Sequence, residues 1–181
     1  MFRRVSPRKG ACRGAVPPRA ASGRYGRSMR FAGTGRFVWV AQWVFGALLP
    51  VFFFLGRGWV GADIGWLAIV GILYGVLTIL ALFVPPILTM FDPEARKKRS
   101  TRVGYDIASI VLWLSIVVGA LTVPDSGDSG HLDSAASSWT GMSYETSAVI
   151  FYASAVVIGL AYLAAFILAI VGIVRGRQVA S

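Results

Sequence analysis

Residues 147–174 read SAVIFYASAVVIGLAYLAAFILAIVGIV, a run of 28 residues without a charged side chain. About 20 apolar residues are enough for a helix to cross the hydrocarbon core of a bilayer, which is about 30 Å thick. At about 1.5 Å per residue, this run is longer than a perpendicular helix needs. It therefore predicts a transmembrane helix that tilts or extends beyond the bilayer.

Three further apolar runs precede it, near residues 37–55, 64–84 and 103–123. The first carries one strongly polar residue, Gln42, and the third has Asp106 near its start. Pro85 and Pro86 follow the second run, and because proline removes a helical N–H we expect the helix to stop or kink there. The pattern predicts an all-α membrane protein whose four transmembrane helices lie within residues 36–176.

The composition of the 181-residue chain excludes a soluble domain. Hydrophobic residues make up 56% of the chain and charged residues only 14%, with a mean hydropathy of +0.67. Soluble domains carry roughly 25% charged residues. The lipid bilayer is therefore the expected surrounding of most of this chain.

Basic residues fall on one side of the predicted helices. Ten precede the first run, five lie in residues 89–102 and two at the C-terminus, against one in residues 56–63 and none in 124–146. These 17 basic residues against one place both termini in the cytoplasm under the positive-inside rule. The chain has no Asn and uses Arg over Lys by 15 to 3, which favours a GC-rich bacterial genome and hence the bacterial cytoplasmic (inner) membrane.

The first 35 residues form an Arg-rich tail with few large apolar side chains, which we expect to be disordered. Three interpretations stay open. In the first, Met29 is the true start and the tail is not part of the protein. In the second, the tail is solvated charge that sets the orientation. In the third, the tail binds nucleic acid or anionic lipid, or acts as a targeting presequence. A start at Met29 removes eight of the 18 basic residues and leaves ten against eight acidic ones, a net charge of +2. Nucleic acid is therefore not the expected partner.

Asp106 is the one ionisable residue inside a predicted span, and such residues are candidate functional sites. In a structural interpretation, Asp106 lies near the positive end of a helix and pairs with Arg102, four residues earlier. In a functional interpretation, Asp106 lines a path for an ion or a proton together with Ser109 and Gln42. We favour the structural interpretation because Asp106 lies within the first turn or so of its span.

The loop between the second and third spans contains the segment DPEARKKRS at residues 92–100. Asp92 is placed to cap a helix that begins at Pro93, and Glu94 can pair with Lys98 one turn later. We expect a short cytoplasmic helix here. Its basic cluster either contacts anionic lipid or serves only as orientation charge, and it consists of Arg96, Lys97, Lys98 and Arg99.

The loop of residues 124–146 carries no Lys or Arg. Its acidic and imidazole side chains are Asp125, Asp128, His131, Asp133 and Glu145. They offer ligands for a weakly bound divalent cation, yet their spacing matches neither an EF-hand nor a zinc template. We favour a solvated acidic loop on the outside, with Ser143 and Glu145 capping the fourth span.

Small residues recur at four-residue spacing in the last three spans, a pattern that lets helix backbones approach closely in lipid. They serve packing within one chain or association of two chains, and we favour the first. The candidates are Gly71 and Gly75 in the second span, Ser115 and Gly119 in the third, and Ala155, Gly159, Ala161, Ala165 and Ala169 in the fourth.

The residue sets of the common enzyme classes are missing from the sequence. The only histidine, His131, lies in a loop, and the lone Cys12 cannot form a disulfide or a Cys-x-x-Cys pair within the chain. We therefore expect no catalytic site, no metal and no cofactor. The leading prediction is a structural or accessory membrane component that binds another membrane protein or itself. The alternative is a subunit of a small channel or transporter that uses Asp106.

Overall fold

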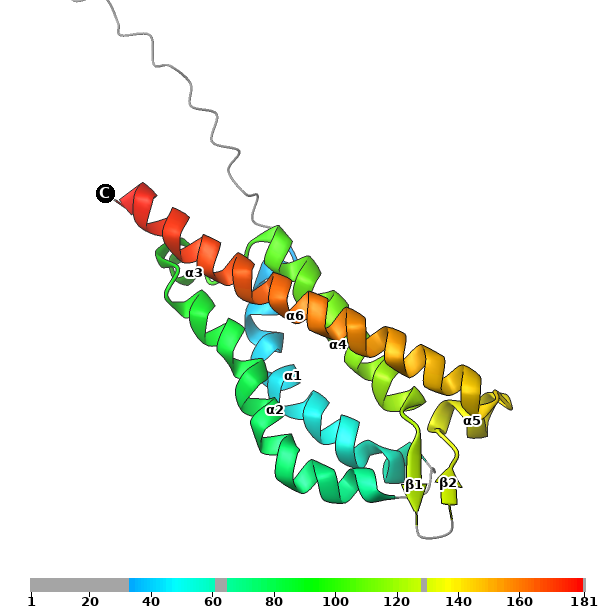
Figure 1. Ribbon diagram of the computed structural model, residues 1–181. Coiled ribbons are helices and arrows are strands. Elements are labelled where there is room, and N and C mark those ends of the chain that lie inside the picture. Colours follow the sequence, from blue (N-terminus) through cyan, green and yellow to red (C-terminus); the bar gives the residue numbers. More distant parts are fainter. Residues whose placement is uncertain (1–32, 61–64, 128–129, 181) are drawn as a thin grey trace, which may run out of the picture.

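The computed structural model describes residues 33–60, 65–127 and 130–180, and these residues are nearly all helical. Four long helices are joined by short elements (Figure 1). In chain order the elements are α1 (Gly35–Leu55), the 3-10 turn η1 (Gly56–Val60), α2 (Trp66–Met90), α3 (Pro93–Lys98), α4 (Val103–Thr122), β1 (Asp125–Gly127), β2 (Gly130–Leu132), α5 (Ala135–Thr140) and α6 (Tyr144–Ala180).

The four helices α1, α2, α4 and α6 are long and apolar enough to cross a membrane, which confirms the predicted all-α chain with four apolar spans. Two of these helices run well beyond the predicted spans. Helix α2 continues past residue 84 to Met90, and α6 runs for 37 residues from Tyr144 to Ala180. The predicted Arg-rich tail falls almost entirely on residues 1–32, which lie outside the described residues together with Cys12 and Met29.

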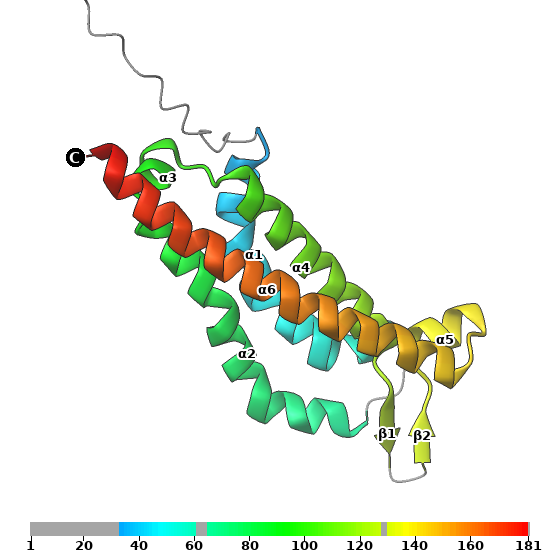
Figure 2. The same ribbon diagram turned by 45° about the horizontal axis from the view of Figure 1, so that its top comes forward.

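Helix α6 lies beside α4 over much of its length, and α1 packs against both α2 and α4 (Figures 1 and 2). The interior of this bundle consists of two clusters of buried apolar side chains, each with members from α1, α4 and α6. The first contains Val38, Tyr105, Ala108, Ala165 and Ala169, and the second contains Leu49, Leu112, Ile116 and Ala161. In both clusters, the buried residues that belong to α6 are all alanines.

One face of α6 consists entirely of small residues. Every buried position of this helix among those whose side chains the structure describes is Ser, Ala or Gly, namely Ser147, Ser154, Ala161, Ala165, Ala169, Gly172 and Gly176. In lipid, helices associate through close packing rather than through the hydrophobic effect, and small side chains allow that approach. The larger side chains of α6, such as Leu160 and Leu163, are more than half exposed and face the surroundings of the bundle.

The Pro85–Pro86 pair does not end α2. Pro85 has no N–H to donate to the carbonyl oxygen of Ala81, four residues earlier. The hydroxyl of Tyr162, on α6, donates to this oxygen instead, at 3.0 Å. One turn later the Thr89 hydroxyl donates to the Pro86 carbonyl oxygen at 2.7 Å. Regular helix therefore continues to Met90, and the Tyr162 hydroxyl replaces part of the bonding that the prolines remove.

The segment predicted as a loop between the last two spans contains a β-hairpin and a short helix. Strands β1 and β2 pair in antiparallel register, with Ser126 opposite His131. Helix α5 is capped by Ser134, whose hydroxyl accepts a hydrogen bond from the Ser137 N–H at 3.0 Å. The Ser147 hydroxyl lies 2.6 Å from that of Ser134 and donates to the Thr122 carbonyl oxygen at 2.9 Å. These hydroxyls join α5 to the end of α4 and the start of α6.

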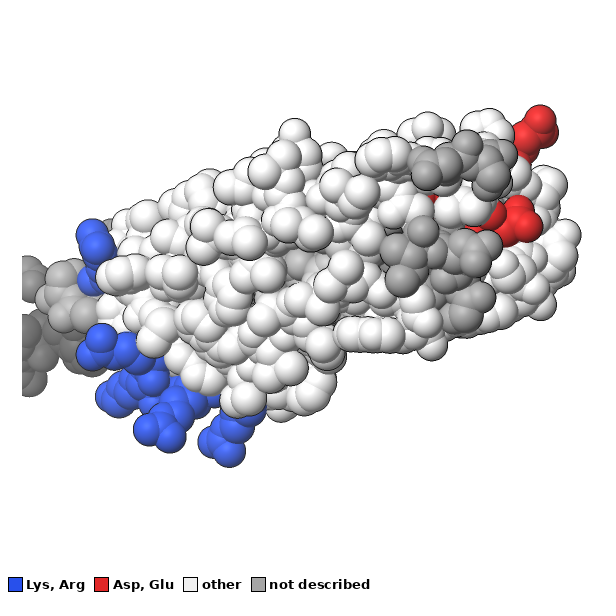
Figure 3. Space-filling model, turned by 90° about the horizontal axis from the view of Figure 1, so that it is seen from below, with Lys and Arg blue, Asp and Glu red and all other residues white. Residues whose placement is uncertain are grey.

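Charged side chains gather at the two opposite ends of the molecule (Figure 3). We call one the basic end; it holds the start of α1, helix α3 and the last turns of α6, with the exposed residues Arg36, Arg96, Lys97, Lys98, Arg99, Arg175 and Arg177. We call the other the acidic end; it holds the hairpin and the start of α6, with Asp125, Asp133 and Glu145. Between the ends, the four long helices expose many large apolar side chains.

Candidate functional site

Several charged side chains are buried close together at the basic end. The turn between α2 and α3 positions them. The Asp92 carboxylate accepts hydrogen bonds from the N–H groups of Glu94 and Ala95, at 3.0 and 3.4 Å. Pro93 occupies the first helical position, and Lys98 donates to Glu94 at 3.3 Å. The predicted short helix, its cap and its ion pair are thus confirmed.

Arg102 joins α3 to the start of α4. Its Nε lies 3.0 Å from Asp92 Oδ2, and its Nη2 lies 3.2 Å from Glu94 Oε2. Asp92 and Arg102 are only 3% and 8% exposed, so their pair is shielded from water. The predicted pair between Arg102 and Asp106 is wrong. Arg102 is the N-cap residue of α4, with an extended backbone, and its side chain turns toward α3 instead.

Two glycines of α6 make room for the buried carboxylate. A Cβ at Gly176 would lie 2.5 Å from Asp92 Oδ1, and one at Gly172 would lie 3.0 Å from Asp92 Oδ2. Any larger residue at Gly176 would have to displace the Asp92 carboxylate, which is held by α3 and by Arg102. This pair of glycines lies outside the small-residue stripes predicted from the sequence, although its four-residue spacing is the same.

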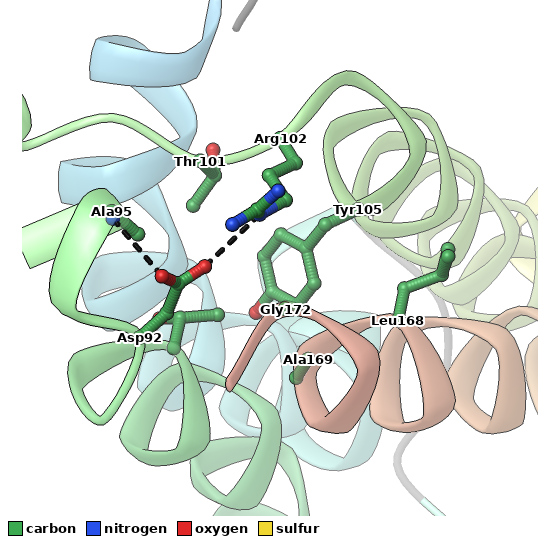
Figure 4. Close-up of a pocket in the computed structure, with 9 residues that line it drawn as sticks. Asp92, Ala95, Thr101, Arg102, Tyr105, Leu168, Ala169 and Gly172 are labelled. Atoms are coloured by element: carbon green, nitrogen blue, oxygen red, sulfur yellow. Dashed lines mark hydrogen bonds and ion pairs between the residues drawn. The ribbon is translucent and has the colours of Figure 1, made fainter. Parts of the chain in front are cut away.

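A small cavity of about 20 Å³ lies beside this ion pair (Figure 4). In the view of Figure 4, the Asp92 carboxylate and the Arg102 guanidinium point toward each other, with Thr101 and Tyr105 on one side and α6 residues Ala169 and Gly172 on the other. A volume of this size holds about one water molecule. The cavity is therefore a packing space of the site and not a substrate pocket.

Asp106 lies next to the site, bound to hydroxyl groups. Its carboxylate accepts hydrogen bonds from Thr101 Oγ1 and, at 3.4 Å, from Thr34 Oγ1. Thr101 also donates its N–H to the Gly35 carbonyl oxygen at 3.2 Å, and its hydroxyl, whose one hydrogen goes to Asp106, lies 3.1 Å from the same carbonyl oxygen. Asp106 thus fastens the loop before α4 to the first turn of α1. Gly35 is required there because a Cβ would lie 2.6 Å from the Thr101 carbonyl oxygen.

The other two residues of the predicted ion path meet at a different place. Gln42 and Ser109 are buried and line a second cavity of about 20 Å³, whose lining does not include Asp106. Gln42 accepts a hydrogen bond from the Tyr105 hydroxyl at 2.9 Å and donates to the Trp39 carbonyl oxygen at 3.2 Å. Tyr105 lines both cavities and lies between them. The structure therefore brings Gln42 and Ser109 together and leaves Asp106 apart.

At the acidic end, Asp125 has a structural position. It is buried, and its Oδ1 accepts hydrogen bonds from the Leu67 N–H at 3.2 Å and the Ser126 N–H at 2.8 Å. Leu67 is in the first turn of α2, so this carboxylate caps a helix that is remote in sequence. For Asp125 the interpretation as a solvated residue is wrong. His131 is exposed, with its ring centroid 4.9 Å from that of Tyr144.

No group of three His, Cys, Asp or Glu residues that could hold a metal ion occurs in the described part of the chain. Asp128, one of the candidate ligands, lies outside that part. The Ser143 hydroxyl accepts a hydrogen bond from the Thr146 N–H at 3.3 Å, so the predicted Ser143 cap of the fourth span is confirmed.

The remaining predicted residues separate into internal and outward-facing ones. Gly71 and Gly75 lie against Phe54 of α1, and Gly119 lies against Ser154 of α6. Ser115 is half-buried. Ala161, Ala165 and Ala169 belong to the small face of α6, whereas Ala155 and Gly159 are exposed, with no atom within 4 Å of a Cβ placed at Gly159. Arg96, Lys97, Lys98 and Arg99 are all exposed on α3 and its end.

The chain matches no protein-family model, and no curated protein or solved structure is found to be similar to it.

Proposed function

We propose that the protein is a non-catalytic structural or accessory component of the bacterial cytoplasmic membrane, with four spans and both termini inside. The observation that carries this proposal is the use of the buried charges. Arg102 binds Asp92 and Glu94, and Asp106 binds two threonine hydroxyls. Side chains that are engaged in holding helices together are not free to bind and release a substrate.

The orientation rests on the separation of charge. All the described basic residues outside η1 lie at the basic end, and the opposite end carries acidic side chains. Such asymmetry is typical of a chain whose basic end faces the cytoplasm. Fusion of a reporter that is active on only one side of the membrane, at residue 126 and at the C-terminus, tests this orientation.

The cavities give little support to the alternative, a channel or transporter subunit. The two spaces beside Tyr105 have about 20 Å³ each, enough for about one water molecule and too little for a hydrated ion. Asp106 does not line either of them. An accessory role instead requires a surface that a partner can reach, and the exposed face of α6 with Ala155 and Gly159 offers one.

Two measurements test the proposal. Proteoliposomes that contain the wild-type chain or Asp106→Asn are expected to show no ion flux above empty vesicles. Flux in the wild type that Asp106→Asn abolishes would establish the channel alternative and overturn the proposal.

A photo-crosslinking residue at Gly159 is expected to capture a defined membrane protein or a second copy, and one at the buried Ala165 is expected to capture neither. Equal results at both positions would count against an accessory surface.

A further inference from the structure

A surface groove of about 370 Å³ lies where α2 passes into α3. Its lining is Met90, Phe91, Pro93, Arg96 and Lys97, so one wall is apolar and the other is basic. Met90 is the last residue of the apolar helix α2, and Arg96 and Lys97 are on the short polar helix α3. The groove therefore lies at the boundary between the apolar and the charged part of the molecule.

The apolar wall continues a surface that faces lipid. Phe91 is 61% exposed and Met90 is 44% exposed, and Ile87, one turn earlier on α2, is 45% exposed. Exposed side chains of this size are normal on a span but are unfavourable in water at the end of one. A lipid acyl chain that lies along the end of α2 would also shield Phe91 from water.

The basic wall carries two charges that the described residues do not neutralise. Lys98 pairs with Glu94, and Arg102 pairs with Asp92 and Glu94. Arg96 and Lys97 are exposed, and no carboxylate of the described chain lies within ion-pair distance of either. An Arg and a Lys side by side bind phosphate through charge-assisted hydrogen bonds.

The two walls are held in a fixed relation to each other. Ala95 lies on the buried face of α3. Asp92 caps this helix and also binds Arg102, at the start of α4. Figure 4 shows Asp92 bonded to Ala95 of α3 and to Arg102 at the start of α4, with α6 beside them. A groove whose walls are already positioned loses less conformational entropy when a ligand binds.

We propose that this groove binds one anionic phospholipid, whose phosphate is held by Arg96 and Lys97 and whose acyl chain covers Met90 and Phe91. A soluble phosphate compound would use only the basic wall. A zwitterionic lipid would add a positive headgroup beside two positive side chains. The combination of walls therefore favours a lipid with net negative charge.

The test is native mass spectrometry of the full chain in detergent, titrated with phosphatidylglycerol or with phosphatidylcholine of the same acyl chains. We expect one phosphatidylglycerol molecule to bind at least tenfold more tightly than phosphatidylcholine. Each basic residue near an anionic surface strengthens binding about fivefold, which corresponds to about 1 kcal/mol. Equal affinity for the two lipids would overturn the proposal.

Matched variants distinguish a site from general attraction to a basic surface. Arg96→Gln with Lys97→Gln is expected to weaken phosphatidylglycerol binding at least tenfold. Arg175→Gln with Arg177→Gln removes the same charge from the same end of the molecule and is expected to weaken it less than threefold. An equal loss in the two double variants would mean that the lipid responds to the overall charge, and the groove would not be the site.

The apolar wall is tested separately with Phe91→Ser, which leaves the charge unchanged. We expect a loss of phosphatidylglycerol binding of at least threefold, and no displacement of the lipid by millimolar inorganic phosphate in the wild type or in the variant. Unchanged lipid binding in this variant, or displacement of the lipid by millimolar inorganic phosphate, would show that the basic residues bind phosphate alone and would overturn the lipid assignment. The unfolding midpoint of each variant in the same detergent confirms that the fold is retained.

Discussion

The hydroxyl of Tyr162 on α6 donates to the carbonyl oxygen of Ala81 on α2, at 3.0 Å, and so replaces the N–H that Pro85 lacks. In a membrane this carbonyl has no water available, and a backbone group without a partner costs several kcal/mol in lipid. A side chain of α6 therefore supplies a hydrogen bond that the backbone of α2 lacks. The bond also ties α6 to the centre of α2.

Tyr162→Phe removes this donor and keeps the ring. We expect the free energy of unfolding to fall by about 0.5–1.5 kcal/mol, the usual net contribution of one hydrogen bond. Equilibrium unfolding in mixed detergent micelles measures the change. Tyr152→Phe, on the same helix, is the control, because Tyr152 is well exposed, and this variant is expected to stay near the wild-type stability.

A second substitution tests whether the Tyr162 hydroxyl stabilises the protein because Pro85 lacks an N–H. Pro85→Ala restores a backbone N–H that can bond to the Ala81 carbonyl oxygen, so the Tyr162 hydroxyl is no longer needed there. In this background Tyr162→Phe should cost clearly less than in the wild type, a coupling that a double-mutant cycle measures. Identical costs in the two backgrounds would mean that the hydroxyl does not compensate for the proline.

The close contact of α6 with α3 gives a prediction about glycine. Gly176→Ala would place a Cβ 2.5 Å from Asp92 Oδ1 and 2.9 Å from Pro93 Cδ. The carboxylate cannot retreat without weakening its bonds to Arg102 and to the start of α3. We expect a destabilisation of about 1–3 kcal/mol, as for other overpacked interiors, in the same unfolding assay.

Gly159→Ala is the matched control on the same helix. Its Cβ would have open space, and alanine is favoured over glycine within a helix by about 0.5–1 kcal/mol. This variant should therefore be as stable as the wild type or slightly more so. If the two substitutions had the same effect, the approach of α6 to Asp92 would not depend on Gly176.

The elements of the fold were predictable where the signal is local. Runs of apolar residues define the four long helices, and the order Asp92, Pro93, Glu94 defines the start of α3, because a cap and its helix are neighbours in sequence. The four-residue spacing within α3 likewise predicts the Glu94–Lys98 pair. These predictions needed no knowledge of which helices lie side by side.

The parts that were missed depend on contacts between distant segments. Arg102 was assigned to Asp106 by spacing alone, yet it binds Asp92, because the turn before α4 directs its side chain toward α3. Asp125 looked like a solvated loop residue, yet it caps α2 through the Leu67 N–H. The Tyr105–Gln42 bond likewise joins residues 63 positions apart. A single sequence does not specify which buried polar groups meet.

The buried pair of Asp92 and Arg102 gives the most stringent prediction. Removing one member of a buried ion pair leaves the other charge without compensation and typically costs about 3–5 kcal/mol. We expect such a loss for Arg102→Met, measured by unfolding in detergent. Lys98→Met, which breaks an exposed pair with Glu94, should cost about 0.5 kcal/mol or less.

Asp92→Asn separates the charge from the cap, because asparagine caps helices as well as aspartate does. In the Asp92→Asn background, no carboxylate remains at position 92 to be left unpaired, so Arg102→Met should cost at least 2 kcal/mol less than in the wild type. This difference identifies the penalty as that of a buried, uncompensated charge. Were Arg102→Met equally costly in both backgrounds, its effect would come from the lost packing of its side chain, and α3 would be held to the start of α4 without help from the ion pair.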